Sequence, residues 1–202
     1  MEQDILIALG ANMPSKAGPP VETISQAIRH MPEDLVKISG ISRFYHTPCF
    51  PRGAGPDYVN AVIHLRPSHP AVSPEILLGQ LHVMEADFGR ERELRWGRRT
   101  LDLDLIAFGS RVVPDIGTYS HWQSLPADAQ MREAPTELVL PHPRIADRAF
   151  VLVPLLDVLP GWCHPVTGLT AREMARRLPR EDLAEVTPLS GNAALVKPAS
   201  PR

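Results

Sequence analysis

The amino-acid sequence predicts an α+β fold of the ferredoxin-like βαββαβ type, in which an antiparallel sheet carries both helices on one face. The first observation is the order of patterns over residues 5–108, which runs strand, helix, strand, strand, helix, strand. The second is residues 58–65, where apolar side chains occupy every second position from Val59 to Leu65, as in a strand with one buried face. The 202-residue chain is long enough for this core and for C-terminal additions.

The first half of this order has clear boundaries. An apolar run over residues 5–9 predicts a buried strand that ends at Gly10. The proline pair at 19–20 precedes apolar residues at helical spacing, which predicts a helix with proline in its first turn. β-Branched and aromatic residues over 35–47 predict a second strand, which Pro48 would end.

The second half places polar side chains on one face of the sheet. Ser73 is a good N-cap for a helix that would run to Gly89, and an alternating strand follows over 102–108. The apolar sides of the two strands, 58–65 and 102–108, would pack on the helices. The polar sides of both strands would then lie on the opposite face of the sheet, which is expected to be free. That face would carry Tyr58, Asn60, Asp102 and Asp104.

The remainder of the chain is expected to add little regular structure. The irregular sequence over residues 109–137 predicts a long surface loop, and residues 138–140 are expected to form a short strand. The Thr-Ala-Arg-Glu pattern at 170–173 is a capping box that predicts a last helix. We therefore expect one domain over residues 1–179 and a disordered tail over 180–202, where no hydrophobic periodicity is present.

Overall composition excludes several classes of function. The formal net charge of −2 gives no general attraction to nucleic acid or to an anionic membrane. Cys49 and Cys163 are the only cysteines, and their surroundings show neither disulfide nor metal spacing. The apolar run at 5–9 is too short for a signal peptide or a membrane span. We expect a cytoplasmic monomer that binds neither nucleic acid nor membrane.

One local cluster of charge indicates a polyphosphate site. Residues 90–99 contain five arginines and two glutamates, directly before the strand that carries Asp102 and Asp104. These two carboxylates would lie about 6.6 Å apart on one strand face, a spacing that suits Mg²⁺, while guanidinium groups suit phosphate. Either cluster alone could be an ordinary solvated surface, but the two are adjacent and of opposite sign.

Other phosphate-binding classes can be compared with this pattern. The sequence has no Gly-x-x-x-x-Gly-Lys-Ser/Thr loop, no Gly-x-Gly-x-x-Gly after the first strand and no zinc spacing. A nucleotide-sugar glycosyltransferase with an Asp-x-Asp metal site is an alternative, although no Rossmann-like half precedes the motif. An RNA-binding ferredoxin-like module with Tyr58 as a stacking platform is another, although acids on the same face would repel phosphates.

The segment from Arg95 to Asp104 resembles the characteristic motif of 6-hydroxymethyl-7,8-dihydropterin pyrophosphokinase (2-amino-4-hydroxy-6-hydroxymethyldihydropteridine diphosphokinase), a family of folate biosynthesis. The resemblance covers about residues 5–170. Further matching pieces occur in the same order, namely Ala8-Leu9-Gly10-Ala11-Asn12, Tyr45-His46-Thr47-Pro48, Asp57-Tyr58-Val59-Asn60-Ala61, Glu85, Gly89-Arg90-x-Arg92, Leu140-Pro141-His142-Pro143-Arg144 and Arg148-Ala149-Phe150.

This resemblance implies an ATP-dependent diphosphokinase that transfers pyrophosphate to the hydroxymethyl group of the pterin and releases AMP. It implies two Mg²⁺ ions held by Asp102 and Asp104, with Arg90 and Arg99 as catalytic arginines that engage the phosphates. The implied ATP-binding residues are Glu85, Arg92, Arg95, Trp96, Arg99, His142 and Arg148. The implied pterin-binding residues are Gly10, Thr47, Pro48, Phe50, Tyr58, Asn60, Trp96 and Phe150, with the rings of Tyr58 and Phe150 on either side of the pterin.

The sequence also departs from the family pattern. Arg98 stands where the family usually has proline, and Val139 occupies a position that is often polar. Pro143 follows His142. Because of Val139 and Pro143, one nucleotide hydrogen bond is expected to be lost or to come from the backbone. The connection over 109–137 is longer than is typical. None of these departures removes an implied metal ligand or ring partner.

Overall fold

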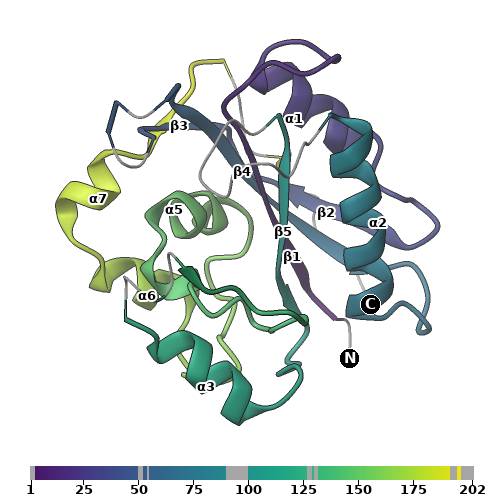
Figure 1. Ribbon diagram of the computed structural model, residues 1–202, viewed down its shortest axis with the longest axis vertical. Coiled ribbons are helices and arrows are strands. Elements are labelled where there is room, and N and C mark those ends of the chain that lie inside the picture. Colours follow the sequence, from purple (N-terminus) through teal and green to yellow (C-terminus); the bar gives the residue numbers. More distant parts are fainter. Residues whose placement is uncertain are drawn as a thin grey trace.

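We analysed a computed structural model, which describes residues 3–49, 52–53, 55–89, 100–126, 129, 132–191 and 195–196. Its core has the predicted order of elements (Figure 1). Within these ranges no helix is both long and apolar enough to cross a membrane. The elements of the core are β1 (Ile5–Ala11), α1 (Pro20–Arg29), β2 (Val36–Ile41), β3 (Tyr45–Thr47), β4 (Tyr58–Pro67), α2 (Pro74–Asp87) and β5 (Asp102–Phe108).

The strands form an antiparallel sheet in the order β5-β1-β4-β2, which confirms the ferredoxin-like prediction. The second predicted strand, over 35–47, is two strands, because the chain leaves β2 after Ile41 and pairs again as β3. Both β2 and β3 pair with β4, one along each half of its length. The ten-residue strand β4 is therefore the centre of the sheet.

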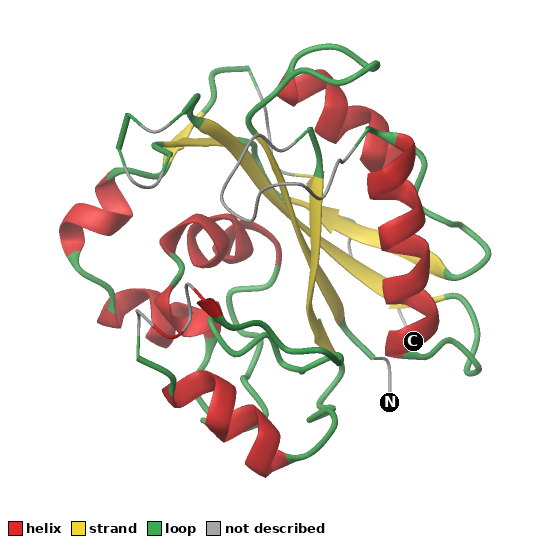
Figure 2. Ribbon diagram, viewed as in Figure 1, coloured by secondary structure: helices red, strands yellow, loops and turns green. Residues whose placement is uncertain are grey.

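Helices α1 and α2 cover one face of the sheet, as predicted (Figure 2). The alternating residues of β4, from Val59 to Leu65, are buried in the core beneath these helices. The hydroxyl of Ser73 accepts the backbone N–H of Ile76 at 3.3 Å and caps α2, also as predicted. Gly89 follows the helix with φ +82°, a backbone conformation that glycine adopts without strain.

The opposite face of the sheet was expected to be free, and this expectation is wrong for most of it. Helix α5 (Ala149–Val158) lies across this face and packs on β4. Its buried residues form a second core with side chains from β1, β4 and β5, which include Leu6, Val62 and Ile106. The apolar run after residue 149 thus builds a third layer that covers most of this sheet face among the described residues.

The expected loop over 109–137 contains a helix, α3 (Ile116–Ser124). Asp115 caps it by accepting the backbone N–H groups of Gly117 and Thr118. Tyr119 is buried, and its hydroxyl lies 3.1 Å from Nε2 of buried His164. The strand expected at 138–140 is reduced to a single bridge between Leu140 and Val113.

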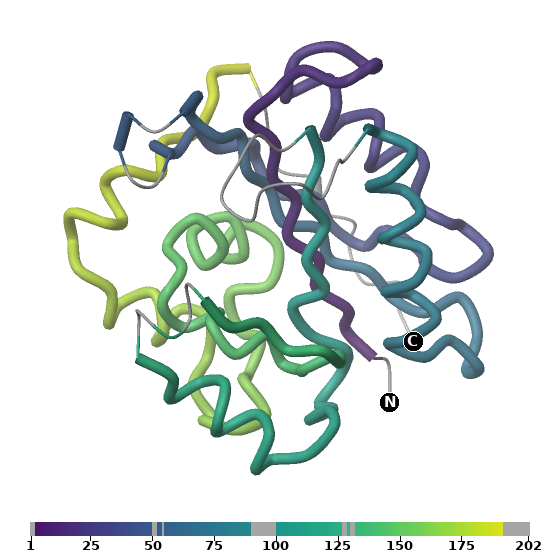
Figure 3. The backbone as a smooth tube through the Cα atoms, in the orientation of Figure 1, coloured from purple at the N-terminus to yellow at the C-terminus, as the bar shows by residue number. Residues whose placement is uncertain are grey.

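The C-terminal part also holds more structure than expected. Helix α6 (Ala171–Arg177) begins with the predicted capping box, in which Thr170 and Glu173 bond to each other's backbone. The disorder expected after residue 180 is wrong for the described residues there, since α7 (Arg180–Ala184) and β6 (Thr187–Pro188) follow. Strand β6 pairs with β3, so this C-terminal segment lies beside residues 45–47 (Figure 3). Strand β7 (Leu195–Val196) pairs with β2.

Candidate active site

Three neighbouring strands bring the predicted acids and amide into one row. Strand β1 lies between β4 and β5, and Gly10 has Asn60 as its partner on one side and Asp102 on the other. Two residues earlier, Ala8 has Val62 and Asp104 as partners. Because cross-strand partners share a face of the sheet, both aspartates and Asn60 project to the same side.

These side chains surround a small pocket at the open end of this face. The residues that line it are Ala8, Leu9, Gly10, Asn60, Asp102, Asp104 and Phe150. Phe150 belongs to the first turn of α5 and is 38% exposed, which is unusual for such a large apolar ring. Helix α5 therefore closes one side of the pocket while the sheet provides its floor.

Gly10 is required by the close approach of its neighbours. A Cβ atom at this position would lie 3.1 Å from Oδ1 of Asn60. Asn60 is only 6% exposed, and its Nδ2 donates a hydrogen bond of 2.6 Å to Oγ1 of Thr47. The amide is thus held in place from β3, and Tyr58, the register partner of Thr47, lies two residues away on the same face.

Arg148 connects the acidic and aromatic parts of the pocket. Its Nη1 lies 3.6 Å from Oδ2 of Asp104, and its guanidinium carbon lies 5.6 Å from the centre of the Phe150 ring. The first distance is an ion pair and the second a cation–π contact. A positive group therefore stands beside the two carboxylates, at the start of α5.

The two aspartates suit a Mg²⁺ ion that is also bound by the phosphates of a substrate. Magnesium is commonly held by one or two carboxylates together with substrate phosphates and water. Asp102 and Asp104 supply such a pair, and the described residues contain no group of three or more acidic, histidine or cysteine side chains that would form an all-protein metal cage. The donor set therefore fits an ion that arrives with a polyphosphate.

His142 lies close to this row and is neutral. Its backbone N–H bonds to the carbonyl of Ile106 in β5, and its Nδ1 accepts the N–H of Arg144 at 3.1 Å. Since Nδ1 accepts, the ring proton lies on Nε2. Burial, together with the guanidinium groups of Arg148 and Arg144, lowers the pKa of the imidazole.

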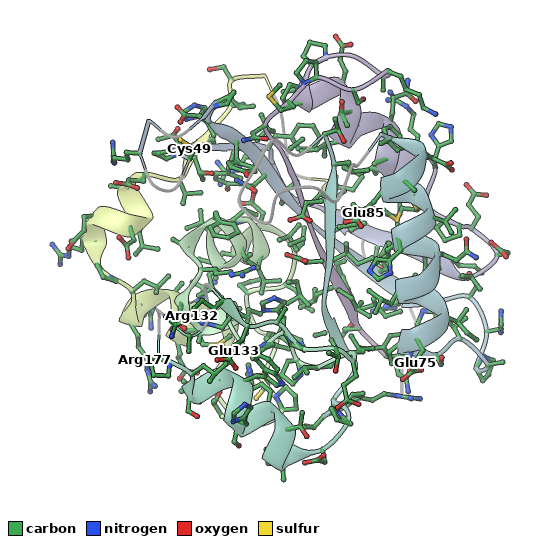
Figure 4. The ribbon with its side chains drawn as sticks, viewed as in Figure 1. Cys49, Glu75, Glu85, Arg132, Glu133 and Arg177 are labelled. Carbon is green, nitrogen blue, oxygen red and sulfur yellow. The ribbon has the colours of Figure 1, made fainter. Side chains whose placement is uncertain are left out.

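Glu85, expected to bind ATP, supports the strand that carries the two aspartates. It lies on α2, on the helix-covered side of β5 (Figure 4), and its Oε1 accepts the backbone N–H of Leu103 at 2.7 Å. Leu103 is the residue between the two aspartates. Glu85 is therefore not among the residues that line the pocket, and it supports the strand that carries the acids.

The structure brings together Gly10, Thr47, Tyr58, Asn60, Asp102, Asp104, Arg148 and Phe150 among the predicted site residues. Pro48 follows β3 directly. Seven further residues singled out in the sequence lie outside the described residues, namely Phe50, Arg90, Arg92, Arg95, Trp96, Arg98 and Arg99.

Sequence reasoning missed some residues that shape the site. Ala8 lines the pocket, and its place two residues before Gly10 on one strand was a signal that could have found it. Asp57 accepts the backbone N–H of Cys49 at 3.1 Å, and its Oδ2 lies 3.1 Å from Nε2 of His46, which fixes the chain after β3. No sequence signal indicated these contacts.

The comparisons with known proteins agree with this geometry. Residues 6–160 match the family described as 7,8-dihydro-6-hydroxymethylpterin-pyrophosphokinase. The chain is 34% identical to the 2-amino-4-hydroxy-6-hydroxymethyldihydropteridine pyrophosphokinase of Synechocystis sp., over 86% of this chain and 75% of the relative. It is 31% identical to the protein of the same name from Pseudomonas aeruginosa, over 79% of this chain and 83% of the relative.

Longer relatives contain a similar portion. Folic acid synthesis protein fol1 of Pneumocystis carinii is 29% identical, over 91% of this chain but only 21% of that protein. Wild-type HPPK-DHPS of Plasmodium falciparum has a similar fold, with a TM-score of 0.59 and 15% identity over 88% of this chain and 45% of that one. Because the family match covers most of the sequence and two relatives exceed 30% identity, the chain belongs to the 7,8-dihydro-6-hydroxymethylpterin pyrophosphokinase family and has this activity in folate biosynthesis.

Proposed function

We propose that the pocket around Gly10 is the site at which this ATP-dependent enzyme transfers a pyrophosphoryl group to 6-hydroxymethyl-7,8-dihydropterin. In this reaction the hydroxymethyl oxygen forms a bond to the β-phosphorus of ATP, the bond from that phosphorus to the AMP oxygen breaks, and the hydroxyl proton is released. The observation that carries the proposal is the row in which Gly10 separates Asn60 from Asp102. In this row, an amide that would bind the pterin lies beside a carboxylate that would hold the metal of the other substrate.

On the phosphate side, Asp102 and Asp104 would hold two Mg²⁺ ions, which when bound offset the charge of the polyphosphate. Arg148 stands next to Asp104 and would turn to the phosphate oxygens. His142 would donate from Nε2, because its Nδ1 already accepts the N–H of Arg144. Glu85 would keep β5 in register through the N–H of Leu103 and would act on the nucleotide only through the aspartates.

On the pterin side, Phe150 and Tyr58 would stack on the two faces of the flat ring. Asn60 would bond to the ring edge, and its bond to Thr47 fixes the orientation of its amide before the pterin binds. Gly10 leaves room for the ring above the sheet, because no side chain extends from the floor of the pocket at that point.

The reaction is tested directly by its products. Purified protein with Mg²⁺, ATP and the hydroxymethyl dihydropterin should form AMP and the pterin diphosphate in equal amounts. Formation of ADP would contradict transfer of two phosphoryl groups in one step. Loss of the reaction on addition of a chelator, with full recovery on adding Mg²⁺, would support the assignment of metal to the aspartate pair.

We also infer that the protein acts as a monomer in the cytoplasm. The described cysteines, Cys49 and Cys163, are free, as is usual in a reducing compartment. Sedimentation or light scattering at micromolar concentration would test the monomer. A dimer that persists on dilution would contradict it.

A further inference from the structure

The far end of helix α5 is fixed by a dense set of hydrogen bonds to Asp157. This carboxylate accepts the backbone N–H of Arg43 at 3.0 Å, the Nε of the same residue at 3.1 Å and its Nη2 at 2.8 Å. It also accepts the hydroxyl of Tyr45 at 2.8 Å. The Asp157 side chain is only 12% exposed, so its carboxylate is shielded from water, whereas the Arg43 side chain is 42% exposed.

The charges of this group are stable in the neutral pH range. Burial opposes ionisation of the Asp157 carboxyl, but the bonds from Arg43 and Tyr45 outweigh it and lower its pKa. Burial, with the bond to Asp157, raises the pKa of Tyr45 to about 12, so this hydroxyl remains a donor. The guanidinium of Arg43 also lies 5.3 Å from the centre of the Tyr45 ring. Arg43 and Tyr45 are therefore donors to an ionised Asp157 throughout this pH range.

The position of this group relates it to the active site. Tyr45 is the register partner of Asn60, so it continues the row that runs through Gly10 to Asp102. Helix α5 begins at the pocket, with Phe150 in its first turn, and reaches β3 at Asp157. Asp157 lies seven positions after Phe150, which places the two about two turns and about 10.5 Å apart on nearly the same helix face.

The apolar contacts in the middle of α5 fix the position of the helix less precisely than the hydrogen bonds of Asp157 do. Its sheet-facing residues, which include Val151, Leu152 and Leu155, make apolar contacts with the second core. Such contacts hold the helix on the sheet, but they have little directional preference. Hydrogen bonds do have directional preference, and those of Asp157 tie α5 to Arg43 and to β3.

We infer that Asp157 is a positioning residue for pterin binding: by bonding to Arg43 and Tyr45 it fixes α5 and thereby sets Phe150 over the pocket. The inference rests on the proposed stacking role of Phe150. Small displacements of the Phe150 ring would weaken its stacking on the pterin, whereas the long side chain of Arg148 can adjust to small displacements of the helix. Pterin affinity should therefore depend on Asp157 more than ATP affinity does.

A double-mutant cycle tests this inference. The four proteins are wild type, Asp157→Asn, Phe150→Ala and the double variant, and the measurement is the Kd of the pterin in the presence of Mg²⁺ and a non-hydrolysable ATP analogue. We expect Asp157→Asn alone to raise the pterin Kd about fivefold to tenfold, with a change below about twofold for the ATP analogue. In the Phe150→Ala background, Asp157→Asn should have almost no further effect, because its action passes through the ring.

Additive effects in the cycle, or an unchanged pterin Kd in Asp157→Asn, would overturn the inference. If Phe150→Ala by itself leaves the pterin Kd unchanged, the stacking proposal fails, and this result is distinct from additivity. Asp115→Asn is the matched control, because Asp115 also accepts several hydrogen bonds but caps α3 away from the pocket. It should leave the pterin Kd unchanged, even if the melting temperature falls.

A milder pair of variants covers the case in which Asp157→Asn does not fold. Tyr45→Phe removes a single bond to Asp157, and Tyr119→Phe removes a comparable buried bond to His164 in the α3 region. We expect a pterin-specific loss of about twofold to fivefold in the first variant and none in the second. Equal pterin affinities in the two variants would contradict a positioning role.

Discussion

Glu85 accepts the backbone N–H of Leu103 at 2.7 Å, on the side of β5 opposite to the pocket. Leu103 stands between Asp102 and Asp104, so a buried carboxylate on α2 fixes the strand position from which both acids project. The bond crosses from a helix to an edge strand of the sheet, where fewer backbone partners are available to hold the strand.

Replacement of Glu85 by leucine should therefore affect both stability and turnover. The backbone N–H of Leu103 would lose its buried acceptor, which costs about 1–3 kcal/mol in free energy of unfolding. We expect turnover to fall while the pterin Kd changes little, because Asn60 and Phe150 lie outside β5. Denaturation curves and pterin titration check the two parts, and Val83→Leu on the exposed side of α2 is the control. A pterin Kd that rises as much as turnover falls would contradict this division.

Asp102→Ala and Asp104→Ala should each reduce the formation of AMP by about a thousandfold or more, because several kcal/mol of charge stabilisation would be lost with the metal. Both side chains are partly exposed at the pocket, so the fold should be retained. Circular dichroism and the melting temperature check the fold, and calorimetric titration with Mg²⁺ and an ATP analogue checks the metal. Full activity in both variants would disprove the assignment of the ligands.

Tyr58→Ala should weaken pterin binding by up to about tenfold, through the loss of one stacking partner. Tyr58 lies on β4 as the partner of Thr47 on β3, away from the aspartates on β5. The affinity for the ATP analogue should therefore be nearly unchanged. Fluorescence titration with each ligand separates the two effects. A loss of equal size for both ligands would show that Tyr58 is not a pterin-specific contact.

The sheet and its helices could be predicted because they depend on local patterns. The alternation from Val59 to Leu65 defines the buried face of β4, and Ser73 defines the start of α2. The same alternation placed Asn60 and Asp102 on one face, and the register confirms this placement. This face, opposite to α1 and α2, was wrongly expected to be free. Periodicity indicates which side of a strand a residue faces, but not which element covers that side.

The contacts that set the finer geometry could not be predicted for a similar reason. Asp157 meets Arg43 over a separation of 114 residues, and no local pattern encodes such a pair. The bond from the backbone of Leu103 to Glu85, which was expected to bind ATP, also has no local pattern, because it depends on how α2 packs on β5. Helix α3 was missed because its mostly polar sequence buries little beyond Tyr119.

Gly10→Ala tests the close approach at the centre of the site. The added Cβ would lie 3.1 Å from Oδ1 of Asn60, and this amide cannot move freely because it is buried and bonded to Thr47. We expect the KM for the pterin to rise severalfold, with a smaller effect on the KM for ATP. Gly79→Ala in α2 is the control, since its Cβ would meet nothing within 4 Å. That variant should keep both KM values and gain about 0.4–1 kcal/mol of stability.

Two histidines with lowered pKa values, His142 and His164, predict how stability depends on pH. Burial lowers the pKa of His164, and burial with the adjacent guanidinium groups lowers that of His142. Below about pH 6.5 the unfolded chain binds protons at these residues while the folded chain does not, so the free energy of unfolding should fall as the pH falls from about 7 to 5. Urea denaturation at several pH values measures this slope. His164→Gln should reduce it, whereas Tyr119→Phe, which keeps the imidazole, should preserve it; an unchanged slope in His164→Gln would show that this residue does not contribute.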